Sequence, residues 1–301
     1  MYYRFFRIFL VFTLCSTSFF SFGSASEWID FEVKNGKVIV PAKIEGIKVK
    51  AVLDTGLKKH YISDSFLAKH PISERKGQSI TIKDTTTEKN KFLYNQVQLD
   101  IFGFENKLDT MIPTSVSEGD IVLGSGFFFN FVMQFDFSNQ RLRFLERGSI
   151  NLKEVENIEM RLHRQSALPI VKVKLDNKKS VWVILSTGSK EGLRLDRLVV
   201  ESEGWDKSLP SQSIEITEIN GKQSYDIMNL PKVEFGPFSI DEVSTAFSKK
   251  GAKFQLLDNN SFTGSYMKGM DVKGVLGYDI LQHFLITVDF KNGRMHVGIP
   301  E

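Results

Sequence analysis

Cysteine is almost missing from this sequence of 301 residues, which contains Cys15 and no other. That residue lies inside an apolar N-terminal run, and the residues before it, Phe12–Leu14, lack the small residue expected ahead of a lipidated cysteine. Without that run the chain has no thiol. Disulfides, cysteine nucleophiles and cysteine-based metal sites are thereby excluded for the remainder of the chain.

A block of basic residues is also missing. The chain has 39 lysines and arginines against 36 acidic residues, a formal net charge of +3. No basic stretch carries interleaved aromatic residues, so a nucleic acid is not expected as a partner. Neither a metal nor another cofactor is expected, because no pair of histidines has the spacing of a metal site. The histidines are His60, His70, His163, His283 and His296.

The N-terminal segment, residues 1–26, has the pattern of a secretory signal peptide. Arg4 and Arg7 precede the apolar run "IFLVFTLCSTSFFSF", and Gly23, Ser24 and Ala25 supply small residues near its end. We therefore expect an exported protein, and the periplasm, the cell surface and the medium remain open. The alternative is an uncleaved anchor, although the run is barely long enough to span a bilayer. No other membrane contact is expected.

An internal repeat organises the rest of the chain. The segment "DIVLGSGFFFNFVMQFDFSNQRLRFL" matches "KGVLGYDILQHFLITVDFKNGRMHVG", with Leu-Gly and Asp-Phe pairs in the same register. Each copy follows a β-type run that ends in a small polar triplet, at 54–56 in the first and 186–188 in the second. The repeat predicts two homologous lobes, residues 27–148 and 160–301, joined by a linker at 149–159. The second lobe has an insertion within "FSKKGAKFQLLDNNSFTGSYMKGMD".

Most segments of both lobes read as β-strands. The runs "KVIVPAKIEGIKVKAVLD" and "LPIVKVKLDNKKSVWVILS" each contain two strands around a turn, and Asn220-Gly221 is a strong hairpin signal. Only short helices are expected, as in "SDSFLAKH" and "YDILQHF". The phenylalanine-rich run over 127–137 is interpreted as core, and Asp136 and Asp289 as structural residues at strand ends. The fold class is all-β.

The order of these motifs resembles the aspartic protease superfamily. "VLDTG" followed by "IVLGSG", and "ILSTG" followed by "GVLGYD", each look like one retropepsin-type unit, and the tandem pair resembles the bilobed plan of pepsin. The resemblance covers nearly the whole chain after residue 26. It implies two β-barrel lobes with a groove between them that binds a peptide or unfolded protein substrate in extended form. We expect a monomer.

The resemblance also assigns roles to particular residues. Asp54 would be a catalytic carboxylate that activates water, sharing a proton with a second carboxylate. The hydroxyls of Thr55 and Thr187 would lock the two loops across the lobe interface. The remaining site-supporting glycines are Gly56 and Gly188 in the turns, and Gly124 and Gly277 in the strands below them. The turn at 84–87 would be the flap; Tyr94 lies in that hairpin, but its place in the flap is open.

The second triplet departs from the family pattern. Ser186 stands where the second aspartate should be, although Ser189 after the triplet has the usual residue type; Leu57, after the first triplet, does not. A serine hydroxyl does not ionise in the range in which carboxylates share a proton, so the catalytic pair is incomplete.

Two functions remain open from the sequence. The first is an aspartic-type endopeptidase, a hydrolase that uses Asp54, with Asp196, Glu191 or a second copy of the chain as the source of the other acid. The second is a pseudo-protease that keeps the groove for peptide or protein binding. Two minor alternatives are a Ser186 nucleophile with Lys190 as its base, and an Asp54 that only caps its own turn.

Overall fold

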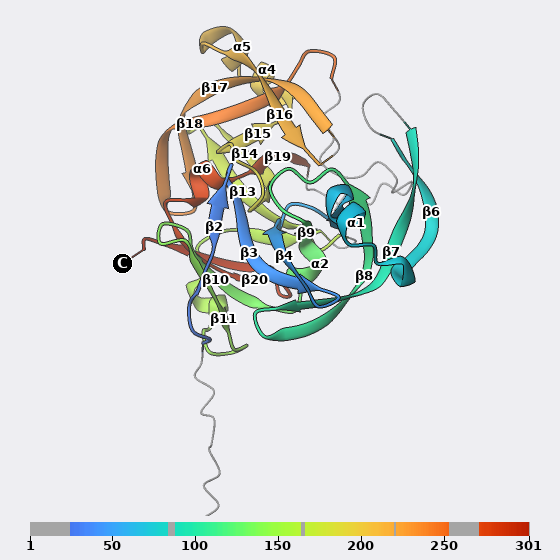
Figure 1. Cartoon of the computed structure of the whole chain (residues 1–301). Coiled ribbons are helices and arrows are strands. Elements are labelled where there is room, and N and C mark those ends of the chain that lie inside the picture. The colour runs from blue at the N-terminus through green and yellow to red at the C-terminus, as the bar shows by residue number, and fades with distance from the viewer. Residues whose placement is uncertain (1–24, 84–87, 164–165, 220, 253–270, 301) are drawn as a thin grey trace, which may run out of the picture.

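The computed structural model describes residues 25–83, 88–163, 166–219, 221–252 and 271–300. Strands dominate these ranges, and they form two lobes that are joined by a third sheet (Figure 1). The all-β prediction is confirmed. The turn at 84–87 and most of the insertion in the second lobe lie outside the described residues, as do residues 1–24 of the expected signal peptide.

The first lobe is built on an eight-stranded sheet. Its strand order is β2-β3-β4-β9-β5-β8-β7-β6, and an additional pairing of β3 with β7 closes it on itself. The strands are β2 (Glu32–Lys34), β3 (Lys37–Ile44), β4 (Ile47–Leu53), β5 (His60–Ser63), β6 (Lys76–Lys83), β7 (Glu88–Ile101), β8 (Phe104–Thr114) and β9 (Ile121–Leu123).

The second lobe repeats that plan strand for strand. Its order is β12-β13-β14-β19-β15-β18-β17-β16, and β13 pairs with β17 as β3 pairs with β7. The strands are β12 (Met160–Leu162), β13 (Pro169–Leu175), β14 (Lys179–Leu185), β15 (Leu193–Leu195), β16 (Gln212–Glu218), β17 (Gly221–Phe235), β18 (Phe238–Ser248) and β19 (Val272–Leu276). The internal repeat of the sequence is therefore a repeat of structure.

The predicted hairpins form where their turn residues allow them. Glu45 and Gly46 join β3 to β4 with φ angles of 48° and 79°, and Asp176 and Asn177 join β13 to β14 at 45° and 56°. Asp, Asn and Gly tolerate this left-handed region better than other residues, so these positions end one strand and start the next. The register that follows places a small polar triplet at the end of both β4 and β14.

A third sheet joins the two lobes. Its order is β1-β11-β10-β20-β21, and the pairing of β10 with β20 is the contact between the two repeats. Gln134 on β10 donates from Nε2 to Thr287 Oγ1 on β20 at 2.9 Å, and both residues are buried. The strands are β1 (Ile29–Asp30), β10 (Val132–Asp136), β11 (Arg141–Leu145), β20 (Leu285–Asp289) and β21 (Arg294–Gly298).

The two matched aspartates end strands of this shared sheet. Asp136 accepts hydrogen bonds from Asn139 and from Arg141 Nε at 2.8 Å, and Asp289 accepts from Asn292 and from Arg147 Nη1 at 3.1 Å. Each carboxylate therefore holds the tight turn that follows it. The prediction that both are structural is confirmed.

Helices are short and few among the described residues. The expected ones are present as α1 (Asp64–Lys69) and α6 (Tyr278–Leu281). The others were not specifically predicted, because segments of three to six residues are too short to show a helical period. They are η1 (Ser73–Arg75), α2 (Ser125–Phe128), α3 (Leu152–Val155), α4 (Arg197–Ser202) and α5 (Trp205–Ser208).

The phenylalanine-rich run packs into the core, as predicted, with one exception. Phe128 and Phe135 are almost completely buried, and Phe128 contacts the ring of Phe290 from the other repeat, with 5.3 Å between the ring centroids. Phe129 is 38% exposed. Aromatic rings from both repeats thus pack against each other in the core.

The segments that precede the two lobes also pair with strands of the shared sheet. Ala25 forms an isolated bridge with Leu145, and Ile158, in the expected linker, forms one with Met295. Within the described ranges no helix has the length and apolar character needed to cross a membrane. The domain boundaries remain predictions.

Thr287→Val should weaken the joint between the lobes. Valine keeps the shape of threonine but leaves the buried Gln134 Nε2 without its partner, which costs about 1–2 kcal/mol. Urea unfolding followed by tryptophan fluorescence measures the change. Thr217→Val, at an exposed position of β16, is the matched control. An unchanged midpoint in Thr287→Val would show that the hydrogen bond does not contribute.

Candidate functional site

The two triplets lie on facing loops between the lobes. Asp54 follows β4 and donates its backbone N–H to Leu123 O at 3.0 Å, while Ser186 follows β14 and donates to Leu276 O at 2.9 Å. Each loop is thus supported from below by the strand that carries its lobe's Leu-Gly pair. The pairs β4–β9 and β14–β19 are both parallel, so the carboxyl ends of all four strands point at one place.

Reciprocal hydrogen bonds between Thr55 and Thr187 lock the loops together. Thr55 Oγ1 donates to Leu185 O at 2.7 Å, and Thr187 Oγ1 donates to Leu53 O at 2.6 Å. Each hydroxyl also accepts the backbone N–H of the other threonine at 3.2 Å. Both side chains are buried, so no water competes for these bonds. The structure brings these residues together as the sequence predicted.

Asp54 and Ser186 face each other across the interface. Ser186 Oγ donates to Asp54 Oδ1 at 2.8 Å, and the same Oδ1 accepts the backbone N–H of Gly56 at 2.9 Å. The backbone N–H of Gly188 donates to Ser186 Oγ at 3.2 Å, in the same way as the N–H of Gly56 donates to Asp54 in the other loop. Asp54 Oδ2 has no hydrogen-bond partner among the described residues. Ser186 Oγ is therefore the group that faces Asp54 across the lobe interface.

Gly56 and Gly188 are required by the closeness of the two loops. A Cβ atom on Gly188 would lie 2.2 Å from Asp54 Oδ2, and one on Gly56 would lie 2.5 Å from Ser186 Cβ. Real Cβ contacts do not reach such distances, so any side chain at either position would force the loops apart.

Gly124 and Gly277 lie directly below the loops. A Cβ on Gly124 would meet Lys59 O at 2.3 Å, and one on Gly277 would meet Glu191 O at 2.4 Å. Gly277 N–H donates to Gly192 O at 3.0 Å. In the first lobe the corresponding donor, the backbone N–H of Gly124, has a different partner.

That partner is the imidazole of His60, which the sequence did not single out. His60 Nδ1 accepts the backbone N–H of Gly124 at 3.2 Å, so Nδ1 carries no proton and the ring is neutral. Burial lowers the pKa of His60 to about 4, against a weak opposing attraction from Asp109. The only sequence signal is positional, since His60 lies six residues after Asp54 as Gly192 lies six residues after Ser186.

Charges around Asp54 partly offset its burial. Asp54 is 9% exposed, and desolvation raises its pKa above the usual range. The hydrogen bonds from Ser186 and Gly56 and the positive charges of Lys37 and Arg194 act in the opposite direction. Lys37 and Arg194 were not identified from the sequence, because neither belongs to a motif.

The other candidate acids bind groups other than Asp54 and Ser186. Asp196 caps α4 by accepting the N–H of Leu198 at 3.1 Å and is 3.8 Å from Lys273 Nζ. Glu191 accepts a 3.4 Å hydrogen bond from Ser189 Oγ. The expectation that either replaces the missing carboxylate is therefore not supported by the geometry.

The structure also places Ser189 and Lys190, which follow the second triplet. Ser189 supports the loop through its backbone, where its carbonyl accepts the N–H of Tyr278 at 2.8 Å. Lys190 is exposed, and no hydrogen bond joins it to Ser186 among the described residues. Lys190 is therefore not placed to act as a base for Ser186. No cluster of metal-ligating side chains occurs in the described part of the chain.

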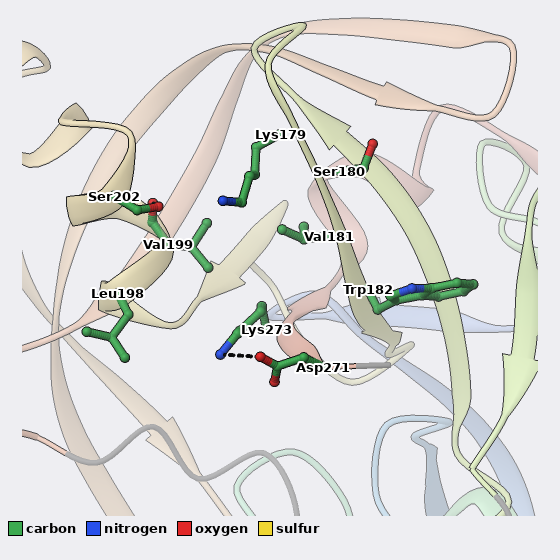
Figure 2. Close-up of a pocket in the computed structure, with 9 residues that line it drawn as sticks. All are labelled: Lys179, Ser180, Val181, Trp182, Leu198, Val199, Ser202, Asp271 and Lys273. Atoms are coloured by element: carbon green, nitrogen blue, oxygen red, sulfur yellow. Dashed lines mark hydrogen bonds and ion pairs between the residues drawn. The ribbon is translucent and has the colours of Figure 1, made fainter. Parts of the chain in front are cut away.

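A pocket of about 430 Å³ lies elsewhere on the second lobe. It is formed by the first residues of β14, together with α4 and the start of β19, so it is at the opposite end of β14 from Ser186. Figure 2 shows Lys179 and Lys273 entering it from opposite sides. Lys179 pairs with Glu203 at 3.4 Å and Lys273 with Asp271 at 2.8 Å, so neither charge is free for a ligand.

Thr187→Val should destabilise the whole protein. The change removes the donor to Leu53 O and the acceptor for Thr55 N–H, both buried, at a cost of about 3 kcal/mol. Thr187→Ser keeps the hydroxyl and should cost about 1 kcal/mol. Chemical denaturation of the two variants measures the difference. A larger loss in Thr187→Ser than in Thr187→Val would mean that the methyl group, not the hydrogen bonding, stabilises the interface.

His60 should make the protein less stable as the pH falls. The folded protein binds this proton only near pH 4, whereas the unfolded chain binds it near 6.5, so stability is lost as pH falls between those values, by up to about 3 kcal/mol. In His60→Asn the amide oxygen can accept from Gly124 without titrating, and this part of the pH dependence should disappear. His60→Phe, which has no acceptor, should be destabilised at every pH. The same acid slope in His60→Asn and the unmodified protein would contradict the assignment.

Comparisons with known proteins identify the fold. No family model matches the chain, and no curated protein matches its sequence. Among solved structures, the aspartic proteinase from Irpex lacteus matches with a TM-score of 0.56 over 92% of this chain and 98% of its own, at 10% identity. Basic 7S globulin from soybean matches 90% of this chain and 93% of its own at 10% identity, with a TM-score of 0.46.

At this level of identity the likeness establishes the fold alone. The lobes, their matched strand orders and the sheet that joins them agree with it independently. The resemblance inferred from the sequence is confirmed at that level: the chain has the bilobed fold of pepsin-like aspartic proteinases.

Proposed function

We propose that this protein binds a peptide or an unfolded protein segment in extended form between its lobes, as a catalytically impaired relative of aspartic proteases. The observation that carries the proposal is the hydrogen bond from Ser186 Oγ to Asp54 Oδ1. It leaves the loop geometry intact while a hydroxyl takes the place of a carboxylate. A peptide between such lobes can pair as an added strand, which does not depend on water activation.

The chemistry of Ser186 explains the impairment. Two carboxylates that share one proton supply a base for water and an acid for the peptide carbonyl. A serine has one proton, and here that proton is donated to Asp54. With no second carboxylate, the general acid is missing, and loss of such a group slows a reaction by about 10²–10⁴-fold.

Slow hydrolysis is the second candidate function. It is favoured by Asp54 Oδ2, which has no hydrogen-bond partner in the described residues, and by burial, which raises the pKa of this carboxyl. Under this alternative the protein is a weak aspartic-type endopeptidase in which Asp54 is the sole carboxylate and acts as the base.

We further propose that the protein is exported and acts as a monomer. Export is supported by the basic start, apolar run and small residues of positions 1–26. Each chain contributes both loops of its own site, so no second copy is needed to complete it.

Binding and cleavage assays on the same samples separate the two candidates. The purified protein is incubated with labelled peptides and an unfolded protein between acid and neutral pH, and both bound and cleaved fractions are measured. We expect binding with little or no cleavage. Ser186→Asp should restore the carboxylate pair and raise acid-pH cleavage by at least about 100-fold, while the neutral isostere Ser186→Asn should not.

Each opposite result has a distinct meaning. Cleavage by the unmodified protein that disappears in Asp54→Asn would establish the slow peptidase instead. If Ser186→Asp folds and binds peptide yet cleaves nothing, Ser186 does not occupy the place of the second catalytic carboxylate.

A further inference from the structure

Arg194 is a partly buried cation beside the candidate site with hydrogen-bonding capacity to spare. Its side chain is 18% exposed, and Nη1 is 2.5 Å from Glu218 Oε1. The guanidinium lies over the ring of Tyr225, 5.8 Å from its centroid. In the described part of the chain, Nε and Nη2 have no partner. Arginine offers its donors as a planar fork, and half of this fork is unused.

The repeat shows that Arg194 faces the same region as a residue of the first lobe. Arg194 pairs with Val275 on β19, and Tyr61 pairs with Val122 on β9. Both valines directly precede a Leu-Gly pair, so Arg194 holds in the second lobe the place of Tyr61 in the first. The second lobe thus presents a charge where the first presents an aromatic side chain.

Nearby acidic groups keep Arg194 charged. Burial opposes the charge, but Glu218, Tyr225, Glu191 and Asp54 outweigh it, and the pKa of Arg194 is raised. Lys37 adds a second positive charge that acts on Asp54, and its Nζ donates only to Ser117 Oγ, at 3.0 Å, among the described residues. Both cations therefore act on Asp54, and Arg194 also interacts with Glu218 and Glu191.

Glu218 reaches Arg194 from the tip of the β16–β17 hairpin, which contacts the opposite lobe. Thr114 Oγ1 at the end of β8 donates to Ile219 O at 3.1 Å (Figure 1 shows β16 pointing toward the first lobe). The Ile219 side chain packs against a first-lobe cluster that includes Tyr61 and Val122. The hairpin therefore bridges the lobes beside the site, and Glu218 is a carboxylate supplied by the chain itself.

We propose that Arg194 forms a carboxylate subsite, so that the peptides this protein binds carry an aspartate or glutamate side chain, which takes the place of Glu218 when the hairpin lifts. The inference rests on the proposed peptide binding. The exchange replaces one carboxylate by another, and the incoming group can use the free donors of Arg194 in a bidentate pair. To lift, the hairpin must break the Thr114 hydrogen bond and withdraw the Ile219 side chain from the first-lobe cluster.

Matched peptides test this subsite. Fluorescence anisotropy measures the binding of labelled, otherwise uncharged ten-residue peptides that carry either Glu or Gln at one position, moved along the peptide. At one register the protein should prefer Glu by about tenfold. Arg194→Gln should abolish that preference, and Arg194→Lys should keep part of it. Arg161→Gln, on β12 and 57% exposed, is the matched control and should change nothing.

Glu218→Gln distinguishes a competing carboxylate from a structural one. If Glu218 occupies the subsite in the free protein, the neutral variant should bind Glu peptides several-fold more tightly. Weaker binding of Glu peptides by Glu218→Gln would overturn the proposal, as would equal affinities for Glu and Gln peptides in the unmodified protein. Binding of no peptide by any of these proteins, each shown to be folded by thermal melting, would instead overturn the proposed function and this inference with it.

Discussion

The reciprocal hydrogen bonds between Thr55 and Thr187 are the constraint on which the rest of the structure depends. Each hydroxyl binds the carbonyl that precedes the other lobe's triplet, so both loops are fixed in one register. The register brings Asp54 against Ser186 and leaves no room for a side chain at Gly56 or Gly188. None of these bonds involves the side chain at position 54 or 186. The loops therefore hold their shape whether or not both positions carry carboxylates.

A site with one carboxylate and one hydroxyl differs from a two-carboxylate site in its protons rather than in its shape or its net charge. In a two-carboxylate site, a shared proton keeps the pair at one negative charge. Here Asp54 alone carries that charge, and Lys37 and Arg194 act on it from outside the loops. The net charge is therefore that of a two-carboxylate site with its shared proton, and what the site lacks is the acidic proton that such a pair would share. The proposed loss of catalysis follows from that missing proton, whereas the proposed preference for acidic ligands depends on Arg194.

The sequence predicted the parts of this protein that repeat. Strand pairs around Glu45-Gly46 and Asp176-Asn177, and the facing triplets, were visible because local turn chemistry and a matched order of motifs specify them. His60, Arg194 and Glu218 were not identified, because their roles depend on which strand faces meet across a barrel or between lobes. Spacing along the chain does not contain that information. Asp196 and Glu191 were proposed because they are close to Ser186 in sequence, and in the structure their carboxylates accept hydrogen bonds from Leu198 N–H and Ser189 Oγ.

The shared sheet also sets the order in which this protein can fold. β10 has β11 on one side, but its other neighbour is β20, which spans Leu285–Asp289 near the end of the chain. Until those residues have been synthesised, the first lobe has an open strand edge, and such edges invite pairing with other chains. During synthesis, the first lobe therefore exposes the edge of β10 until β20 has been made. This edge must be kept from pairing with other chains during that time.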